Sequence, residues 1–556
     1  MFKLNVSALS LKKPVSLHLS CFNLLLASWL GLALNYRFYA TLYALTPYNT
    51  LKTIGFLCST SVIVIAAYAL ILQLFSWRNN AKIVAAILII LGGCSAYFVN
   101  SLGVMITADQ IQNMQQTDVR EVLDLCSIPF LMWSLGFVVL PLLLLTRIQL
   151  RASTATQQIK SKLLQILAAL GLIVLLLFVF YVDYAAIFRE HRELKAMLSP
   201  QNTVSAVYKY NKQQTHQKIN TIIPYGTDAK IQSKNEASRP KLMVLVVGET
   251  ARAESFALNG YQRPTNPELS QLQLINFRQV SACGTATAVS VPCMFSGMSR
   301  ANYDASLAQQ REGLLDIAQR AGYHVTWMDN NSGCKGVCNR VNQYQIPQAL
   351  RQKWCDARGE CLDEILVESL KDYLAHLDPK QRQPQLIVLH QMGSHGPAYY
   401  KRASKAYQPF QPICSSNAIQ GCRLDGVKNA YDNSIVYTDH VLAQIIQQLQ
   451  QQEHYQTGFW YLSDHGESTG EHGLYLHGAP YAIAPSQQTH VPMLMWFSKA
   501  WQANQPAQIN CLKQQQSRSL SQDYLFPTLL NLLDVKSQVI DHKNDMLNEC
   551  SANVAR

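Results

Sequence analysis

Five long apolar runs occupy the first third of the 556-residue chain, and they constrain its fold more than any other feature. At ~1.5 Å per residue, each run can cross the ~30 Å hydrocarbon core of a membrane, the first only just. A cleaved signal peptide would explain at most the first run. Buried helices of a soluble core are excluded because the five runs follow one another with hardly any charge. Residues 1–183 therefore form a predicted membrane domain, with spans at Leu17–Leu34, Ile54–Phe75, Ile83–Ile106, Leu125–Thr146 and Leu163–Val182.

Lysine and arginine are unevenly distributed over the loops between these runs. They precede the first span and join the second to the third and the fourth to the fifth, at Lys3, Lys12, Lys13, Arg78, Lys82, Arg147, Arg151, Lys160 and Lys162. Because cytoplasmic loops carry the excess of positive charge, we expect a cytoplasmic N-terminus and an external location for everything after Val182. Residues 1–199 hold 15 Lys and Arg against 7 Asp and Glu, a net +8 of the whole chain's +12. The basic balance thus reflects topology and anionic headgroups, and no nucleic-acid partner is expected.

The 14 cysteines fall into two groups. Four of them, Cys21, Cys58, Cys94 and Cys126, lie in or beside the predicted spans. The other ten lie between residues 283 and 550, an even number in the part predicted to be outside. A zinc site is a weaker explanation, because only Cys334 and Cys338 have a zinc-like spacing and no second such pair completes it. An oxidising compartment explains them better. Pairing of neighbours is the simplest hypothesis, giving Cys283/Cys293, Cys334/Cys338, Cys355/Cys361, Cys414/Cys422 and Cys511/Cys550.

The chain after the last span divides into a connecting region, residues 184–239, and a domain, residues 240–556. Tyr184–Leu198 has the mixed charge and helical spacing of an amphipathic helix at the membrane boundary, with an ordinary connector helix as the alternative. Residues 201–239 are interpreted as a polar linker. From Lys241 onward short β-rich runs alternate with helical stretches, which predicts an α/β domain with a mainly parallel sheet and helices on both faces. The predicted strands are Leu242–Val247, Leu274–Val280, His324–Met328, Leu386–Leu389, Phe459–Leu462 and Val491–Phe497, and the predicted helices include Glu312–Arg320, Glu364–Leu377 and Ser434–Gln451.

Chemically active residues follow several of these strands. Because ligands bind beyond the carboxyl ends of parallel strands, these residues are expected to meet at one edge of the sheet. Carboxylate and imidazole groups without thiolate suit a catalytic Zn²⁺. Each residue alone has a commoner explanation, since Asp-His-Gly is usually a turn and a lone histidine is usually structural. Their joint placement favours a metal site among Glu249, His395, Asp464, His465 and His477.

Thr287 is the candidate nucleophile. It stands at the predicted start of a helix, where free backbone N–H groups and the helix dipole can hold a phosphoryl group. A zinc ion on its hydroxyl would lower the hydroxyl pKa. Thr285 is the alternative nucleophile, because a threonine at a helix start is often only an N-cap.

Four motifs make the sequence resemble the phosphoethanolamine transferases that modify lipid A, the EptA and mobile colistin resistance group of the alkaline phosphatase/sulfatase-like superfamily. They are VVGETARAESFALNGY at 246–261, CGTATAVSVPCMFSGM at 283–298, DNNSGCKGVC at 329–338 and SDHGESTGEHGLYLHG at 463–478. The resemblance covers essentially the whole chain. It implies one tightly bound zinc on Glu249, Thr287, Asp464 and His465, and a phosphoethanolamine intermediate on Thr287. The substrate headgroup or a second zinc would be bound by Asn331, Lys335, His395, His477 and Glu467.

The implied function is transfer of phosphoethanolamine from phosphatidylethanolamine to a phosphate of lipid A, with polymyxin resistance as its consequence. The resemblance further implies a monomer in the bacterial inner membrane with a periplasmic catalytic domain. The nearest alternative is the same transfer to a heptose, a Kdo sugar or a periplasmic glucan. A sulfatase is disfavoured because Gly-Thr follows Cys283 in place of C-x-P-x-R. A transporter or a membrane sensor is an alternative of a different class. Transport is disfavoured because only His18 and Asp124, at the ends of the first and fourth spans, bring ionisable groups near the hydrocarbon.

Overall fold

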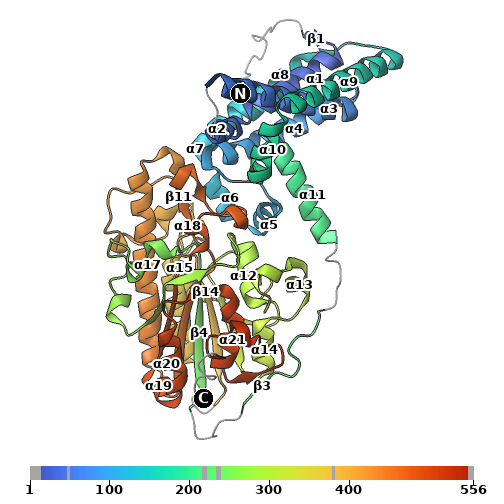
Figure 1. The fold of residues 1–556 in the computed structure, drawn as a ribbon. Coiled ribbons are helices and arrows are strands. Elements are labelled where there is room, and N and C mark those ends of the chain that lie inside the picture. The colour runs from blue at the N-terminus through green and yellow to red at the C-terminus, as the bar shows by residue number, and fades with distance from the viewer. Residues whose placement is uncertain (1–13, 47–49, 216–221, 233–238, 379–381, 549–556) are drawn as a thin grey trace, which may run out of the picture. The chain divides into compact units, whose positions relative to one another are not determined.

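The computed structural model describes residues 14–46, 50–215, 222–232, 239–378 and 382–548 (Figure 1). The chain forms two compact units and passes between them three times. Residues 1–107 and 128–206 make the membrane unit. Residues 108–127 and 207–556 make the second unit, which we call the catalytic unit because it holds the residues that the sequence predicts to be catalytic. A short segment between two membrane helices therefore belongs to the catalytic unit, which the sequence did not predict.

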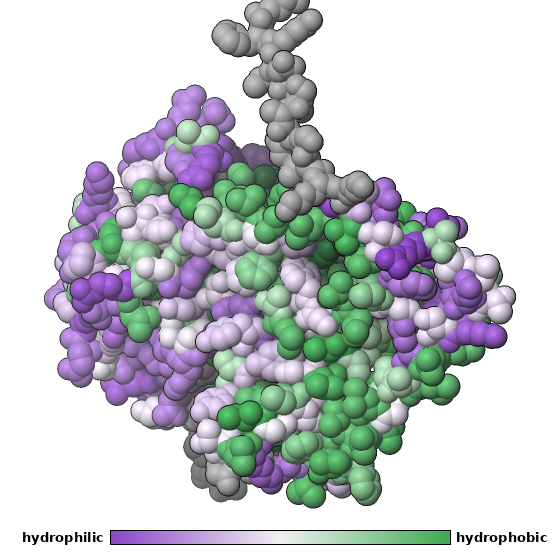
Figure 2. Space-filling view, turned by 90° about the horizontal axis from the view of Figure 1, so that it is seen from above, coloured by the Kyte–Doolittle hydropathy of each residue, from purple (hydrophilic) through white to green (hydrophobic). Residues whose placement is uncertain are grey.

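The membrane unit contains four straight helices that are long and apolar enough to span a bilayer. They cover Thr50–Phe75 (α3), Ala81–Leu102 (α4 Ala81–Tyr97 with η3 Phe98–Leu102), Ile128–Arg147 (α7 Ile128–Ser134, η4 Leu135–Val139 and α8 Leu140–Arg147) and Ala155–Val179 (α9). The first predicted span, Leu17–Leu34, lies in a bent pair, Leu19–Ala33 and Tyr36–Leu45, whose limbs meet at 58°. Most side chains of α9 are exposed, as lipid-facing residues should be. Figure 2 shows a broad hydrophobic area on the face that it draws.

Asn35 fills the break in the first span, between the π-helix Trp29–Ala33 (η2) and α2, Tyr36–Leu45. Its amide nitrogen donates to the Leu30 carbonyl at 2.8 Å, and its amide oxygen accepts from the Ser199 backbone N–H at 2.8 Å. The Tyr68 hydroxyl donates to the Ser199 carbonyl at 3.0 Å. Backbone groups without partners are costly in hydrocarbon, so these bonds make the break tolerable. They also fix the chain that follows the last span to the first.

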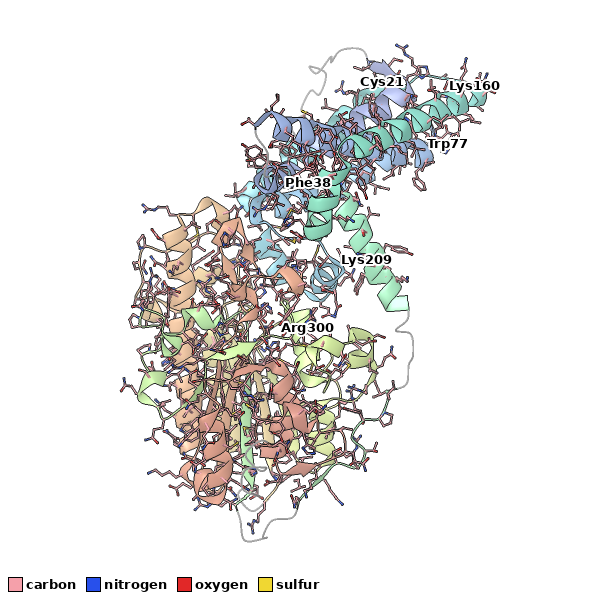
Figure 3. The ribbon with its side chains drawn as sticks, viewed as in Figure 1. Cys21, Phe38, Trp77, Lys160, Lys209 and Arg300 are labelled. Carbon is pink, nitrogen blue, oxygen red and sulfur yellow. A yellow bond between two sulfur atoms is a disulfide. The ribbon has the colours of Figure 1, made fainter. Side chains whose placement is uncertain are left out.

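Labelled side chains show the two ends of the membrane unit (Figure 3). Cys21, Trp77 and Lys160 lie toward one end, and Phe38 lies toward the other. The Lys162 ammonium donates to the carbonyls of Gln73 and Ser76 at 2.7 Å each and stacks over the Trp77 ring. The lysine therefore binds the otherwise free carbonyls at the end of α3, where a positive charge also suits the helix dipole.

The connecting region contains more structure than the sequence predicted. The single helix expected at Tyr184–Leu198 is divided into α10, Tyr181–Glu190, and a 3₁₀ helix, Arg192–Met197 (η5). His191 separates them with non-helical backbone angles, and its ring bonds the Glu193 carboxylate at 2.9 Å. The expected linker begins with a further helix, α11, Gln201–Thr215. Its sequence is too polar to show a clear apolar stripe, so hydrophobic periodicity could not reveal it.

A seven-stranded sheet forms the centre of the catalytic unit, in the order β5-β13-β10-β4-β9-β7-β8. Only β13 runs against its neighbours, so the sheet is mainly parallel, as predicted. Every residue of β4 is buried, as expected for a strand covered on both faces. The strands are β4 Lys241–Gly248, β5 Ile275–Phe277, β7 His324–Asp329, β8 Asn342–Gln343, β9 Gln385–His390, β10 Gln456–Ser463 and β13 Met493–Phe497.

One predicted strand, Leu274–Val280, is two strands in the structure. Its first part is β5 in the central sheet, and its second part is β6, Gln279–Ser281, which pairs with β14, Ser519–Ser521. Between them the Arg278 backbone N–H bonds the Gln516 carbonyl. An apolar run alone does not reveal such a change of partner, because both parts keep the residue types of a strand.

Helices cover both faces of the sheet (Figure 1). α17, Leu424–Gln450, lies on one side with α16, Glu364–Ala375, and α12, Thr287–Phe295, lies on the other with α14, Leu314–Arg320, and α21, Leu525–Leu532. The core on the α14 and α21 side includes Met243, Leu245 and Val247 of β4. A sheet buried in this way holds the ends of its central strands in fixed positions, which the site requires.

Four disulfides close short loops of the catalytic unit, as neighbour pairing predicted. They join Cys283 to Cys293, Cys334 to Cys338, Cys355 to Cys361 and Cys414 to Cys422. Cys511 is also disulfide-bonded, and Cys550 lies outside the described residues. The free thiols among the described residues are Cys21, Cys58 and Cys94 of the membrane unit and Cys126, which lies in residues 108–127.

Thiol labelling of the oxidised full-length protein tests this pattern. We expect modification at the four free cysteines after denaturation, and none at the eight half-cystines until a reductant is added. The measurement is peptide mass spectrometry with two distinguishable alkylating reagents. Labelling of several half-cystines before reduction would contradict both the pairing and the oxidising compartment.

Candidate metal centre and nucleophile

The candidate site lies at the carboxyl ends of β4, β10, β9 and β7. The β4–β10 register pairs Gly248 with Ser463, so the next residues, Glu249 and Asp464, leave the sheet side by side. The Asp464 backbone N–H extends this pairing by a bond of 2.9 Å to the Gly248 carbonyl. The convergence predicted for residues that follow the strands is thus, for Glu249 and Asp464, a consequence of one aligned strand pair.

Glu249, Asp464 and His465 form a buried cluster. Each offers a ligand atom within 4.8 Å of the others. The His465 Nε2 atom lies 3.4 Å from a carboxylate oxygen of Glu249 and 3.4 Å from one of Asp464, and all three side chains are fully buried. Among the described residues this is the one group of histidine, cysteine, aspartate and glutamate with metal-binding geometry.

The electrostatics of the cluster fit a metal ion. Burial raises the pKa of Glu249, and the neighbouring Asp464 carboxylate raises it further. Burial also raises the pKa of Asp464 and lowers that of His465 to about 4. Two carboxylates that are buried together and face a neutral imidazole are unfavourable without a cation, and their oxygen and nitrogen donors are those of catalytic zinc sites. The residues therefore fit the metal site predicted from the sequence.

Thr287 brings a hydroxyl to this cluster. It is the first residue of α12, and its oxygen lies 3.2 and 3.1 Å from the two carboxylate oxygens of Glu249 and 3.3 Å from His465 Nε2. Thr285 is directed elsewhere, since its hydroxyl donates to the Ala479 carbonyl at 2.7 Å. The residue that caps α12 is Ala286, so Thr285 does not take the N-cap position either. The geometry thus favours Thr287 over Thr285.

Asn331 supports the cluster from β7. Its side-chain nitrogen donates to a carboxylate oxygen of Glu249 and to the Gln391 carbonyl, both at 2.8 Å. The sequence suggested a substrate contact for Asn331, and in the structure the residue orients the Glu249 carboxylate. Such supporting hydrogen bonds to metal ligands fix the ligand geometry.

Two more predicted residues, His477 and His395, lie next to the cluster. The His477 ring centre is 4.4 Å from that of His465 and 5.4 Å from that of His395. Burial lowers the pKa of His477 to about 4, and it lowers that of His395 well below the usual value. Glu467 lies 3.4 Å from His477 Nδ1, and burial raises its pKa to about 8. The arrangement forms a second group of donors beside the first.

Lys335 lies farther out, held by its own loop. Its ammonium donates to the Ser332 hydroxyl at 2.8 Å and to the Gln116 carbonyl at 3.1 Å. Burial raises the pKa of Glu121, and the positive charge of Lys335 offsets part of this rise. A Glu121 carboxylate oxygen also lies 3.9 Å from His395 Nε2. An ammonium, a carboxyl group and an imidazole, from Lys335, Glu121 and His395, thus lie near one another.

Sequence reasoning missed two contributors to this site. His390 is fully buried at the end of β9 and bonds Asp329 at 2.7 Å; burial would lower its pKa, but the aspartate raises it overall. His390 and Asp329 each directly follow a predicted strand, so their position in the sequence could have indicated that they belong to the site. Glu121 comes from the segment between two membrane helices, α4 and α7, and nothing in its local sequence indicated that it belongs to the catalytic unit.

The fold and the cluster define a class, the sulfatase-like α/β proteins, here joined to a membrane unit. The family model described as sulfatase matches residues 241–535, and the model described as phosphoethanolamine transferase EptA/EptB matches residues 64–215. Phosphoethanolamine transferase EptA of Escherichia coli (strain K12) is 40% identical over 552 residues, or 97% of this chain and 98% of that protein. The chain therefore belongs to the EptA family of phosphoethanolamine transferases, which confirms the resemblance seen in its motifs.

Two further comparisons agree. Phosphatidylethanolamine transferase Mcr-1 of Escherichia coli is 36% identical over 506 residues, covering 89% of this chain and 91% of that protein. The integral membrane protein lipooligosaccharide phosphoethanolamine transferase A (EptA) from Neisseria meningitidis superposes with a TM-score of 0.92 at 33% identity, covering 97% of this chain and 99% of that one. The chain is thus an integral membrane protein with a soluble C-terminal domain.

Removal of one cluster ligand tests the metal site. Glu249→Gln keeps the side-chain shape and removes the charge, so we expect metal affinity to fall at least ~10-fold, since loss of a mere supporting partner of a metal ligand already costs ~10–100-fold. Metal content after gel filtration, measured by plasma mass spectrometry, reports the change. Glu254→Gln is the matched control, because Glu254 pairs with His490 outside the cluster. Equal metal content in both variants would remove Glu249 from the ligand set.

Proposed function

We propose that the chain transfers phosphoethanolamine from phosphatidylethanolamine to a phosphate of lipid A through a phosphothreonine on Thr287. One observation carries the proposal: the Thr287 hydroxyl stands at a helix N-terminus and within hydrogen-bond distance of the Glu249 carboxylate in a buried cluster. The cofactor is zinc, held by Glu249, Thr287, Asp464 and His465. When bound, it supplies Lewis acidity that lowers the pKa of the threonine hydroxyl and offsets charge on the phosphoryl oxygens.

The protein's own residues perform the two transfers as follows. The Thr287 oxygen attacks the phosphorus of the donor and releases its proton to water, and the bond from phosphorus to the diacylglycerol oxygen breaks, with that oxygen taking a proton from water. In the second step a deprotonated oxygen of a lipid A phosphate attacks the same phosphorus, and the Thr287 oxygen leaves and takes a proton back from water. Backbone N–H groups in the first turn of α12 face the phosphoryl group and stabilise its charge.

The surrounding residues match the donor headgroup. Lys335 suits the phosphoryl oxygens, and the carboxyl groups of Glu121 and Glu467, whose raised pKa values a neighbouring cation would lower, suit the ethanolamine ammonium. His395 and His477 have lowered pKa values, so they are neutral imidazoles near pH 7 and can exchange hydrogen bonds without adding positive charge. A second zinc on His395, His477 and Glu467 is the alternative use of these residues.

The proposed location is the inner membrane of a bacterium, with the N-terminus in the cytoplasm and the catalytic unit in the periplasm. The distribution of Lys and Arg over the loops and the disulfides of the catalytic unit support this orientation. Both proposed substrates are lipids, so a site on the periplasmic side would reach them in the outer leaflet. The protein would act as a monomer.

The alternative to lipid A is an acceptor of another chemical class. Transfer to a heptose, a Kdo sugar or a periplasmic glucan would use the same cluster and nucleophile. Lipid A is preferred because the resemblance of the four motifs implies it, and because the similar solved protein from Neisseria meningitidis, at 33% identity, is named a lipooligosaccharide phosphoethanolamine transferase.

The nucleophile is tested by two neighbouring substitutions. Thr287→Ala should abolish transfer and remove the phosphoethanolamine adduct from the protein, because no other hydroxyl of a described residue is bonded to Glu249. Thr285→Ala, the matched control, should keep most of the activity because its hydroxyl only bonds the Ala479 carbonyl. Intact-protein mass spectrometry after incubation with the donor measures the adduct. An adduct that survives in Thr287→Ala and vanishes in Thr285→Ala would reassign the nucleophile.

The acceptor and the consequence are tested in cells. Phosphoethanolamine on a lipid A phosphate adds an ammonium and reduces the attraction of cationic peptides, which acts over ~8 Å at physiological salt. Cells that make the protein should therefore tolerate more polymyxin, and their lipid A should gain the mass of one or two phosphoethanolamine groups. Thr287→Ala should reverse both effects. Raised tolerance with unmodified lipid A would contradict the mechanism, and modification confined to core sugars would favour the alternative acceptor.

A further inference from the structure

Residues 108–127 join two membrane helices along the chain but belong to the catalytic unit. They form α5, Ala108–Gln116, and α6, Val119–Leu125. We refer to residues 108–127 as the docked segment. α5 packs against the nucleophile helix α12. A segment with this position can contribute to the site, and its contacts within the catalytic unit show which residues would do so.

One face of the docked segment bonds the residues around the cluster. The Gln112 side chain donates to the Ala288 carbonyl, directly after the nucleophile, at 3.1 Å. The Gln110 side chain donates to the His477 carbonyl at 3.1 Å, and the Gln116 carbonyl accepts from Lys335 at 3.1 Å. These bonds position the backbone of α12, the backbone at His477 and the ammonium of Lys335.

Asp124 anchors the other end of the docked segment. Its side chain is only 1% exposed, and one carboxylate oxygen accepts from the Lys401 ammonium at 2.6 Å and from the Asn417 amide at 3.2 Å. The Asn417 amide also bonds the Asp124 carbonyl at 3.0 Å. The Arg402 guanidinium lies 3.5 Å from the second carboxylate oxygen. A buried carboxylate with this many partners is expensive to expose or to leave unpaired.

The partners of Asp124 are themselves connected to the site. Arg402 donates through Nε to the carbonyl of His395 at 2.8 Å. The Glu360 carboxylate offsets the positive charges of Lys401 and Arg402, from which it lies 3.3 Å and 3.7 Å away. Two disulfides brace the loops that receive Asp124: Cys355–Cys361 encloses Glu360, and Cys414–Cys422 encloses Asn417. The receptor for Asp124 is therefore preformed, and it contacts a residue of the active site.

We propose that Asp124 is a positioning residue that docks residues 108–127 on the catalytic unit, and that the transfer site is complete only in the docked state. The part concerning transfer rests on the proposed function. The ion cluster of Asp124, Lys401, Arg402 and Glu360 sets the population of the docked state, and the bonds of Gln110, Gln112 and Gln116 convert docking into the correct geometry of α12, His477 and Lys335.

Limited proteolysis of the full-length protein in detergent measures docking without any substrate. Arg120 is the only lysine or arginine between Lys82 and Arg147, so tryptic cleavage after it gives a diagnostic fragment. Asp124→Asn keeps the shape and removes the charge; we expect cleavage after Arg120 to be at least ~10-fold faster and kcat/KM for transfer to fall at least ~10-fold. Metal content should match the parent, because Asp124 does not touch the cluster.

Two further variants make the result specific. Lys401→Gln removes the other partner of the Asp124 ion pair. It should reproduce both effects even if the Asp124→Asn protein accumulates poorly. The double variant should be little worse than either single one, since both remove the same interaction. Asp425→Asn is the matched control, because Asp425 is 78% exposed and pairs only loosely with Arg423, 3.7 Å away.

Each outcome decides a part of the proposal. Parental cleavage rates in both single variants would show that Asp124 does not dock the segment. Faster cleavage with parental kcat/KM would show that docking does not position the site. Absence of transfer in the parent would instead overturn the proposed function, and the cleavage result would still stand or fall by itself.

Discussion

Two carboxylates that are buried side by side are the constraint on which the rest of the catalytic unit depends. Glu249 and Asp464 leave adjacent parallel strands in register, and neither is exposed to solvent. Their mutual repulsion can be relieved by protonation or by a cation. The raised pKa values of Glu249 and Asp464 correspond to relief by protonation. The oxygen and nitrogen donors of the cluster, together with the Thr287 hydroxyl, correspond to relief by a bound cation. The strands that deliver the carboxylates have to be rigid, which is what a sheet covered on both faces provides.

The sequence predicted this part of the molecule well because the signal is local. Apolar runs such as 242–247 and 459–462 have to be strands in a covered sheet, and polar residues directly after them have to lie at its edge. Glu249, Asp464 and His465 follow from that rule. The distances in the structure then separate Thr287 from Thr285, which the sequence alone left as alternatives.

What the sequence did not predict depends on partners far away in the chain. In the sequence Asn35 is an isolated polar residue after an apolar run. In the structure it bonds Ser199, and this bond helps to satisfy the backbone at the break in the first span, where unpaired groups would be costly in hydrocarbon. The sequence places Asp124 at the edge of the fourth span as an ionisable group. It does not indicate that Asp124 bonds Lys401 and Asn417. No periodicity of 2 or 3.6 residues encodes such pairs, because the interacting groups are separated by 164 and 277 positions.

The four disulfides share a role that their energetics alone would not suggest. Each closes a short loop, for which chain entropy supplies only ~2–3 kcal/mol, less than a long loop would yield. Their positions are informative: Cys283–Cys293 encloses the start of α12, the helix that begins with Thr287, and Cys334–Cys338 encloses Lys335. The other two enclose Glu360 and Asn417, which surround Asp124. The covalent links thus lie where loops have to present a charge or a hydroxyl in one orientation, and the core of the sheet needs none. Oxidation would therefore fix the geometry of the site and of its docking surface more than it would raise overall stability.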